Sequence, residues 1–215
     1  IRSRSDLDRH FVGHPEAFYK LYDLDIHYVS EGTTRALWNT LKLVSELFPE
    51  DRKPGVIQAS KLTEQALRAN DAVYVGRLDA LGMLEDVLVQ VSGFDLGTSQ
   101  GELIDRASGR RFHWAQLSQD KEAVDEQTRM MRDYGYIATL RDTGGKRILI
   151  IAGITDSALL HMTQLVSDEK NLQNIARTAG GAESFEALFE IHARGNRIVA
   201  TKLQIARPLG RTQAS

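Results

Sequence analysis

Two stretches of the same form decide the fold: Val73–Asp79 (VYVGRLD) and Ile150–Asp156 (IIAGITD). Each is an apolar strand that ends in a glycine, and each has an aspartate three residues after that glycine, where a helix can begin. This form is typical of the corner between a strand and a helix in an open α/β sheet. Ligands of such sheets bind beside the carboxyl ends of the strands. We therefore expect the two corners to line one crevice.

The first half of the chain alternates strand and helix patterns. The expected strands are 26–29, 56–57 and 72–76. The expected helices are 34–48, a helix capped by Ser60, and 79–88. Strands that alternate with helices in this order favour a parallel sheet with right-handed crossovers.

The second half is rich in hairpin signals, which are paired apolar runs around glycine turns. The expected hairpins join 102–105 to 111–114, 136–140 to 147–152 and 185–193 to 197–206. Helices are expected at 156–166 and 169–178, and a solvated helix or mobile loop in the highly charged segment 116–133. Together the two halves predict an α/β fold with three layers: a mixed, mostly parallel sheet, helices on both faces and a hairpin-rich C-terminal half.

The 215 residues fit a single α/β domain, with residues 1–25 as an N-terminal extension and 207–215 as a frayed tail. The chain begins with Ile1 and not with Met, so we expect a processed protein or a piece of a longer one. Further domains of the same polypeptide are therefore expected partners, and a homodimer is a second expected partner. No feature decides the compartment, and we favour the cytoplasm.

Composition excludes several classes of function. The 27 Lys and Arg residues nearly balance 29 Asp and Glu residues, which argues against direct binding of nucleic acid by bulk charge. The longest apolar run, Ile148–Ile154, is far shorter than the roughly 20 residues of a membrane span. The absence of cysteine excludes disulfides, thiolate metal sites and a cysteine nucleophile. Phosphate-binding glycine motifs are also absent, and we expect no cofactor.

Nine residues at three strand–helix corners are the candidate ligand-binding residues. The glycines would let a ligand approach the backbone, the hydroxyls and helix amides would donate hydrogen bonds, and Arg77 would neutralise an anion. The candidates are Ser30, Gly32 and Thr33 at the first corner, Gly76, Arg77 and Asp79 at the second, and Gly153, Thr155 and Asp156 at the third.

A simpler interpretation of these corners stays open. Asp79 and Asp156 can be helix N-caps, the glycines can be turn residues, and Arg77 can pair with Asp79 or Glu85. We assign no catalytic residue and expect no metal site, since His10 and His14 lack a helical context. Elsewhere, Asp105 and His113 are expected as a cross-strand pair. A small basic and aromatic hairpin is formed by Arg106, Arg110, Arg111, Phe112 and Trp114.

Several strand and turn stretches from Ile26 onward also carry a resemblance. They are His27–Thr33, Asp71–Gly76, Ile104–Asp105 with Ser108–Gly109, Asp133–Ile137 and Ile148–Gly153. In these stretches, which cover most of the chain, it resembles a poorly characterised group of bacterial α/β domains attached to multidomain regulators. Ser30–Thr34 is also similar to the first corner of periplasmic-binding-like effector domains, where hydroxyls and helix amides hold small anionic ligands. The resemblance implies a sensor-like or regulatory domain.

Our hypothesis is therefore a ligand-sensing regulatory domain of a larger bacterial signalling or transcription-regulating protein. It would bind a small polar or anionic molecule at the carboxyl edge of the strands. The alternative is an enzyme that acts on a nucleotide or sugar phosphate in the same crevice, with Asp79 or Asp156 as general base. A structural module that dimerises through an edge strand is the third alternative.

Overall fold

The computed structural model describes residues 12, 30–47, 54–97, 101–117, 129–141, 144–195 and 197–209. The chain divides into two compact units, Ile1–Ser30 and Glu31–Ser215, and the elements below belong to the second. The strand expected at 26–29 and the segment 118–128 lie outside the described residues.

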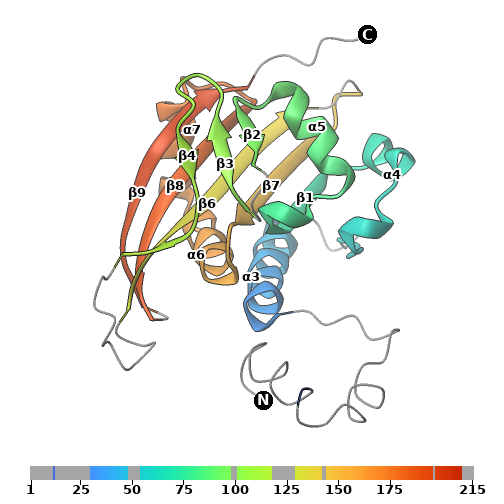
Figure 1. The fold of residues 1–215 in the computed structure, drawn as a ribbon. Coiled ribbons are helices and arrows are strands. Elements are labelled where there is room, and N and C mark those ends of the chain that lie inside the picture. The colour runs from blue at the N-terminus through green and yellow to red at the C-terminus, as the bar shows by residue number, and fades with distance from the viewer. Residues whose placement is uncertain are drawn as a thin grey trace. The chain divides into compact units, whose positions relative to one another are not determined.

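The main sheet is mixed, which confirms the α/β class (Figure 1). Its strands lie in the order β1 (Ala72–Arg77), β7 (Arg147–Gly153), β6 (Met130–Arg141), β8 (Phe185–Arg194) and β9 (Arg197–Pro208), and β5 (Ala115–Gln116) also pairs with β6. Among the described strands only β1 and β7 pair in parallel.

The prediction of a mostly parallel sheet is therefore wrong. Val56 and Ile57, expected in a parallel strand, form no strand, and their side chains are exposed. The three predicted hairpins are present. Two of them, β6–β7 and β8–β9, add antiparallel neighbours to the main sheet, and the third forms β3 and β4 of a separate small sheet. Most strands of the main sheet are thus joined to their neighbours by antiparallel pairing, whereas we expected mostly parallel strands connected by helices.

Five helices and a second, small sheet complete the described fold. The helices are α3 (Glu31–Leu47), α4 (Glu64–Ala69), α5 (Met83–Val91), α6 (Asp156–Val166) and α7 (Glu169–Thr178). The small antiparallel sheet has the order β2 (Phe94–Leu96), β3 (Leu103–Asp105) and β4 (Arg111–Phe112). Short 3-10 turns occur at η1 (Ala59–Lys61) and η2 (Leu78–Ala80).

Helix capping explains which helix boundaries were predicted well. The α6 and α7 boundaries match the prediction because Thr155 and Asp168 accept backbone N–H groups of the first turns. The helix expected from residue 79 begins only at Met83, after the η2 turn. Gly82, with a φ of 59°, lies between the turn and the helix, and only glycine adopts this conformation readily.

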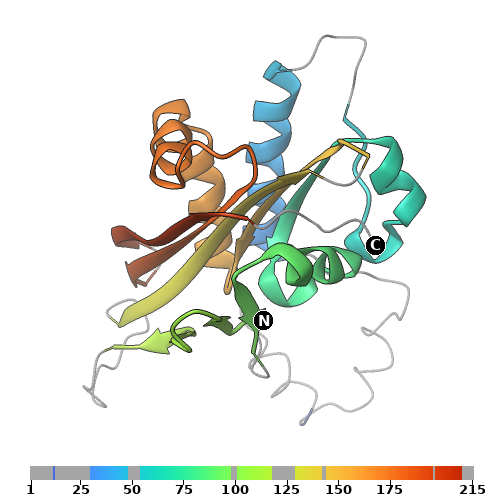
Figure 2. The same ribbon diagram turned by 90° about the horizontal axis from the view of Figure 1, so that it is seen from above.

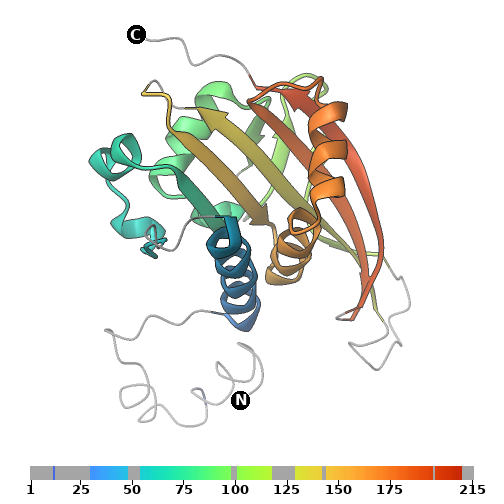
Figure 3. The same ribbon diagram turned by 180° about the vertical axis from the view of Figure 1, so that it is seen from behind.

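Helix α5 and the small sheet cover one face of the main sheet, and α6 and α7 cover the other (Figure 2). Each face has its own hydrophobic cluster. On one face Tyr136, Ile150 and Leu188 belong to a cluster with residues of α5 and the small sheet. On the other face Ile137 and Ile151 pack with residues of α6 and α7. Helix α3 lies on this second face and contacts α6 and β1 (Figure 3).

Two segments expected to be irregular contribute to the sheet. Arg207 and Pro208, expected in a frayed tail, complete β9, and the N–H of the buried Leu209 donates to the Ser184 carbonyl at 3.0 Å. Residues 130–133, expected in a solvated helix or loop, begin β6. Both predictions are wrong at these residues, because the charged side chains of Arg207 and Asp133 find partners inside the fold. Residues 210–215 lie outside the described residues.

We expect Gly153→Ala to destabilise the protein by about 1–3 kcal/mol, the usual cost of overpacking. A Cβ atom at Gly153 would lie 2.6 Å from the Thr155 carbonyl oxygen and 2.9 Å from the Leu159 Cα, so the first turn of α6 would have to move. Gly55→Ala is the control, since a Cβ there meets nothing within 4 Å. Urea unfolding of both variants measures the effect, and equal stability of the two would contradict it.

Candidate functional site

The corners after β1 and β7 lie side by side at one end of the main sheet. In the parallel register Arg77 is opposite Gly153. Helix α3 begins beside α6, so that a Cβ at Gly32 would lie 2.7 Å from the Asp156 Cβ. We call this place the β1–β7 end: Gly32, Thr33, Gly76, Arg77, Asp79, Gly153, Thr155 and Asp156. Eight of the nine candidates thus converge, whereas Ser30 belongs to the other compact unit.

Arg77 and Asp79 form a partly exposed ion pair at the β1–β7 end. The Arg77 Nε and Nη2 atoms donate to the two Asp79 carboxylate oxygens at 2.9 and 2.7 Å, and the side chains are 39% and 22% exposed. The hydrogen bond to Asp79 raises the pKa of Arg77, and the hydrogen bond from Arg77 lowers the pKa of Asp79. Arg77 therefore pairs with Asp79, one of the two partners expected for it.

The first turns of α3 and α6 are joined by polar side chains. The Thr33 hydroxyl donates to the Asp156 carboxylate at 3.3 Å. Thr155 is the N-cap of α6, accepting the Ala158 N–H at 3.4 Å, and its hydroxyl donates to Asp133. The interpretation of Asp156 as an N-cap is therefore wrong.

Asp79 is not an N-cap either. It lies in the η2 turn, and the N-cap position of α5 belongs to Gly82. The two oxygens of the Asp79 carboxylate accept hydrogen bonds from Arg77.

Asp133 is a buried carboxyl group that the sequence interpretation missed, because it lies in a segment expected to be a solvated helix or loop. Its side chain in β6 accepts a hydrogen bond from the Thr155 hydroxyl, and the residue is only 4% exposed. Burial raises the pKa of Asp133, while hydrogen bonds from Thr155 and from the Tyr134 amide lower it. The net shift of the pKa is upward, so this group ionises less readily than an exposed aspartate.

The glycines at the β1–β7 end face protein atoms. A Cβ at Gly76 would lie 2.7 Å from the Cζ atom of Tyr74, and those at Gly32 and Gly153 would meet α6. Close packing of the chain therefore explains these glycines. They lie in α3, β1 and β7, so the interpretation of them as turn residues is wrong. The groups left to meet a ligand are the partly exposed side chains of Arg77, Asp79 and Asp156.

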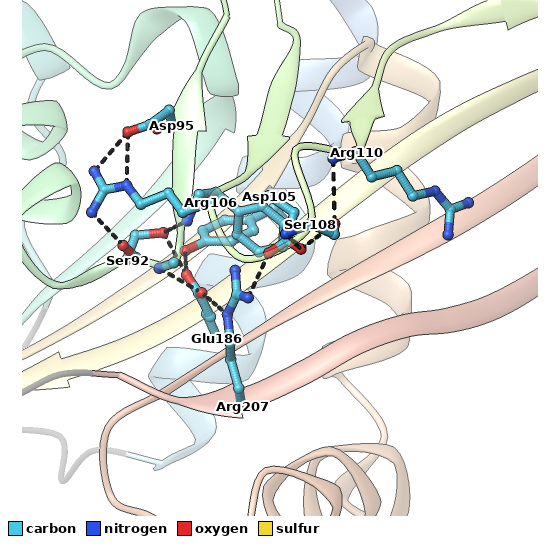
Figure 4. A network of polar contacts seen from close by, with 11 residues as sticks. Ser92, Asp95, Asp105, Arg106, Ser108, Arg110, Glu186 and Arg207 are labelled. Atoms are coloured by element: carbon cyan, nitrogen blue, oxygen red, sulfur yellow. Dashed lines mark hydrogen bonds and ion pairs between the residues drawn. The ribbon is translucent and has the colours of Figure 1, made fainter.

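A second polar cluster is centred on the carboxylate of Glu186, which is 0% exposed (Figure 4). Its Oε1 atom accepts the Gly93 N–H at 2.9 Å and the Arg207 Nε–H at 2.6 Å. Its Oε2 atom accepts the hydroxyls of Ser92 at 2.6 Å and Tyr136 at 2.7 Å. Both oxygens are thus doubly hydrogen-bonded, which compensates the buried charge.

Arg207 extends this cluster to the small sheet. Its Nη1 atom donates to Asp105 at 2.6 Å, and its guanidinium lies 4.4 Å from the centre of the Phe94 ring. Burial raises the pKa of Asp105, but the bonds from Ser108 and Arg207 outweigh it, so the pKa lies below its ordinary value. The predicted pair of Asp105 and His113 is wrong, because the Asp105 carboxylate accepts hydrogen bonds from Arg207 and Ser108.

The basic and aromatic hairpin is largely occupied by contacts within the chain. Arg106 binds Asp95 at 2.8 Å, Arg111 binds Glu102 at 3.2 Å, and the Phe112 ring is buried. Within the described ranges, no group of His, Asp and Glu side chains could hold a metal ion. No helix in the described part of the chain is both long and apolar enough to cross a membrane.

We expect Glu186→Gln to lower the free energy of unfolding by about 3–5 kcal/mol, because it removes one partner of a buried ion pair. Glu64→Gln is the control, since Glu64 pairs with Arg68 on the surface of α4 and such pairs contribute about 0–1 kcal/mol. Denaturant unfolding of both variants at pH 7 measures the difference. A loss of similar size in the two variants would show that the Glu186 cluster contributes no more than a surface pair.

Asp133 gives a pH-dependent prediction. A carboxyl group with a raised pKa in the folded state destabilises the fold as pH rises above the ordinary Asp value. Asp133→Asn lacks this effect, so its stability relative to the parent chain should be higher at pH 7 than at pH 4. Urea unfolding of both chains at the two pH values tests the sign, and the opposite trend would refute the raised pKa.

Comparison of the chain with known proteins finds no match: no family model, no curated protein and no solved structure matches it.

Proposed function

We propose that this chain is a ligand-sensing regulatory domain of a larger bacterial protein and that it binds a small polar molecule at the β1–β7 end. The Arg77–Asp79 pair carries the proposal. It is partly exposed at the carboxyl ends of two adjacent parallel strands, where α/β sheets generally bind ligands.

The charges narrow the chemistry of the ligand. Arg77 faces the carboxylate of Asp79, and both Asp79 and Asp156 hold its pKa above the ordinary value. An anionic group must therefore compete with Asp79 for the guanidinium. A ligand that also carries amino or other hydrogen-bond donor groups can satisfy the two carboxylates. We thus favour a polar ligand with donor groups over a purely anionic one.

The contact between α3 and α6 offers a route by which binding could act on the rest of the protein. The Thr33 hydroxyl joins the start of α3 to Asp156 at the start of α6. A ligand that binds Asp156 competes for this hydrogen bond. Since α3 begins directly after the unit Ile1–Ser30, a shift of α3 would act on the neighbouring part of the polypeptide.

The enzymatic alternative is less well supported by the electrostatics. A general base that works near neutral pH needs a pKa near that pH. The pKa of Asp79 is instead lowered by its hydrogen bond with Arg77, which makes it a weaker base. This argues against Asp79 as the general base, and binding without turnover is the function that we propose.

Calorimetry and thermal-shift assays against a panel of small polar metabolites test the proposal. For a ligand found in this way, Arg77→Ala should weaken binding by about tenfold or more, as expected for loss of a charge-assisted bidentate contact. Arg68→Ala is the matched control, because Arg68 also forms an ion pair but lies on α4.

Two results would contradict the proposal. Full affinity of Arg77→Ala for the ligand would remove Arg77 from the site. Turnover of a panel compound that Asp79→Asn abolishes without loss of fold would favour the enzyme.

A further inference from the structure

We propose a second ligand site, for a small oxyanion such as a phosphate or carboxylate group, between Arg141 and Arg147. Arg147 begins β7, and Gly153 ends it, so this site lies at the opposite end of that strand from the β1–β7 end. A hollow of about 210 Å³ is found here, lined by Thr139, Leu140, Arg141, Arg147 and Glu183. The proposal does not depend on the proposed function.

The sheet register places the side chains of Arg141 and Arg147 on the same face of the sheet, and both residues line the hollow. Arg141 and Arg147 are direct partners in the antiparallel pairing of β6 and β7. Side chains of directly opposed residues lie on the same face of a sheet, and like charges in such a pair repel each other. An anion bound between the two side chains would relieve this repulsion. The planar fork of donors on each guanidinium suits carboxylate and phosphate oxygens.

The other contacts of the two arginines leave room for such an anion. The Arg141 Nε atom lies 3.0 Å from the Glu183 carboxylate, and the side chains are 42% and 75% exposed, so the pair is weak. The backbone N–H of Arg147 donates to Asp71 at 2.8 Å. Among the described residues, no carboxylate pairs with the Arg147 guanidinium. Arg147 is thus the main donor, and Glu183 is a competitor for the anion.

The size of the hollow limits the ligand. Pockets for drug-sized molecules have volumes of roughly 300–1,000 Å³, so this smaller hollow fits a single anionic group. The hydroxyl of Thr139 is already used, since it donates to the Glu183 carbonyl at 2.8 Å. The two guanidinium groups would therefore provide the recognition.

Titration of the full chain with inorganic phosphate and, separately, with acetate tests this site. Isothermal calorimetry at low and high salt gives the affinities, which should fall with salt. We expect Arg147→Gln to weaken binding by about tenfold, the effect of losing a charge-assisted contact. Glu183→Gln should strengthen binding, because it removes the competing carboxylate. Arg68→Gln on α4 is the control and should bind like the parent chain.

Comparing the two anions shows whether the site prefers a phosphate group or a carboxylate group. Saturable binding of phosphate alone or of acetate alone, with the expected order of the variants, supports the site and identifies its preferred group. The proposal is overturned if neither anion binds, if Arg147→Gln binds as well as the parent chain, or if Glu183→Gln fails to strengthen binding. Unfolding midpoints of the variants confirm that each of them is folded.

Discussion

The buried carboxylate of Glu186 is the contact on which the arrangement of the two sheets depends. An ionised group without water or donors around it would cost several kcal/mol, and this group has four donors from β6, β9 and the turn between α5 and β2. Arg207 then joins Glu186 to Asp105 of the small sheet. Because the four donors come from three separate parts of the chain, the carboxylate fixes the small sheet against the main one. Two edge-to-face ring contacts, Phe94 with Tyr136 and Phe112 with Tyr134, also join the small sheet to β6.

The β1–β7 end depends on a different constraint, the single parallel pairing of the described main sheet. Because β1 and β7 run in the same direction, their carboxyl ends and the turns that follow them lie together. The close contact of Gly153 with α6 sets where that helix starts, and Thr155 fixes its first turn through Asp133. The candidate residues are thus positioned by packing, and Arg77, Asp79 and Asp156 are the side chains left to meet a ligand.

Local signals in the sequence predicted the elements that local chemistry determines. The boundaries of α6 and α7 follow from capping side chains, and the hairpins follow from glycine turns. Whether neighbouring strands of the main sheet run parallel or antiparallel was not predictable in this way. The apolar pair Val56–Ile57 has the pattern of a strand, but it is exposed and unpaired in the fold. Strand pairing is decided by contacts across the whole domain, which a pattern of a few residues does not encode.

The same limit explains the functional groups that were missed. Glu186 and Ser92 are 94 positions apart in the sequence, and Asp133 and Thr155 are 22 apart. No spacing rule connects such pairs, so the sequence pattern predicts a solvated helix or mobile loop at Asp133 and a frayed tail at Arg207. The convergence of the glycine corners was predictable, because a parallel pair of strands brings its carboxyl ends together whatever lies between them in the chain.

Native-state hydrogen exchange tests most directly whether the Glu186 cluster joins the small sheet to the main sheet. The informative amides are those of Gly93, which donates to Glu186, and of Asp105 and Arg106, which lie in the small sheet or at its end. Our account predicts that these amides exchange as slowly as those of β6 and β8, since one cooperative unit opens as a whole. Fast exchange of the small sheet while β6 and β8 stay protected would contradict it.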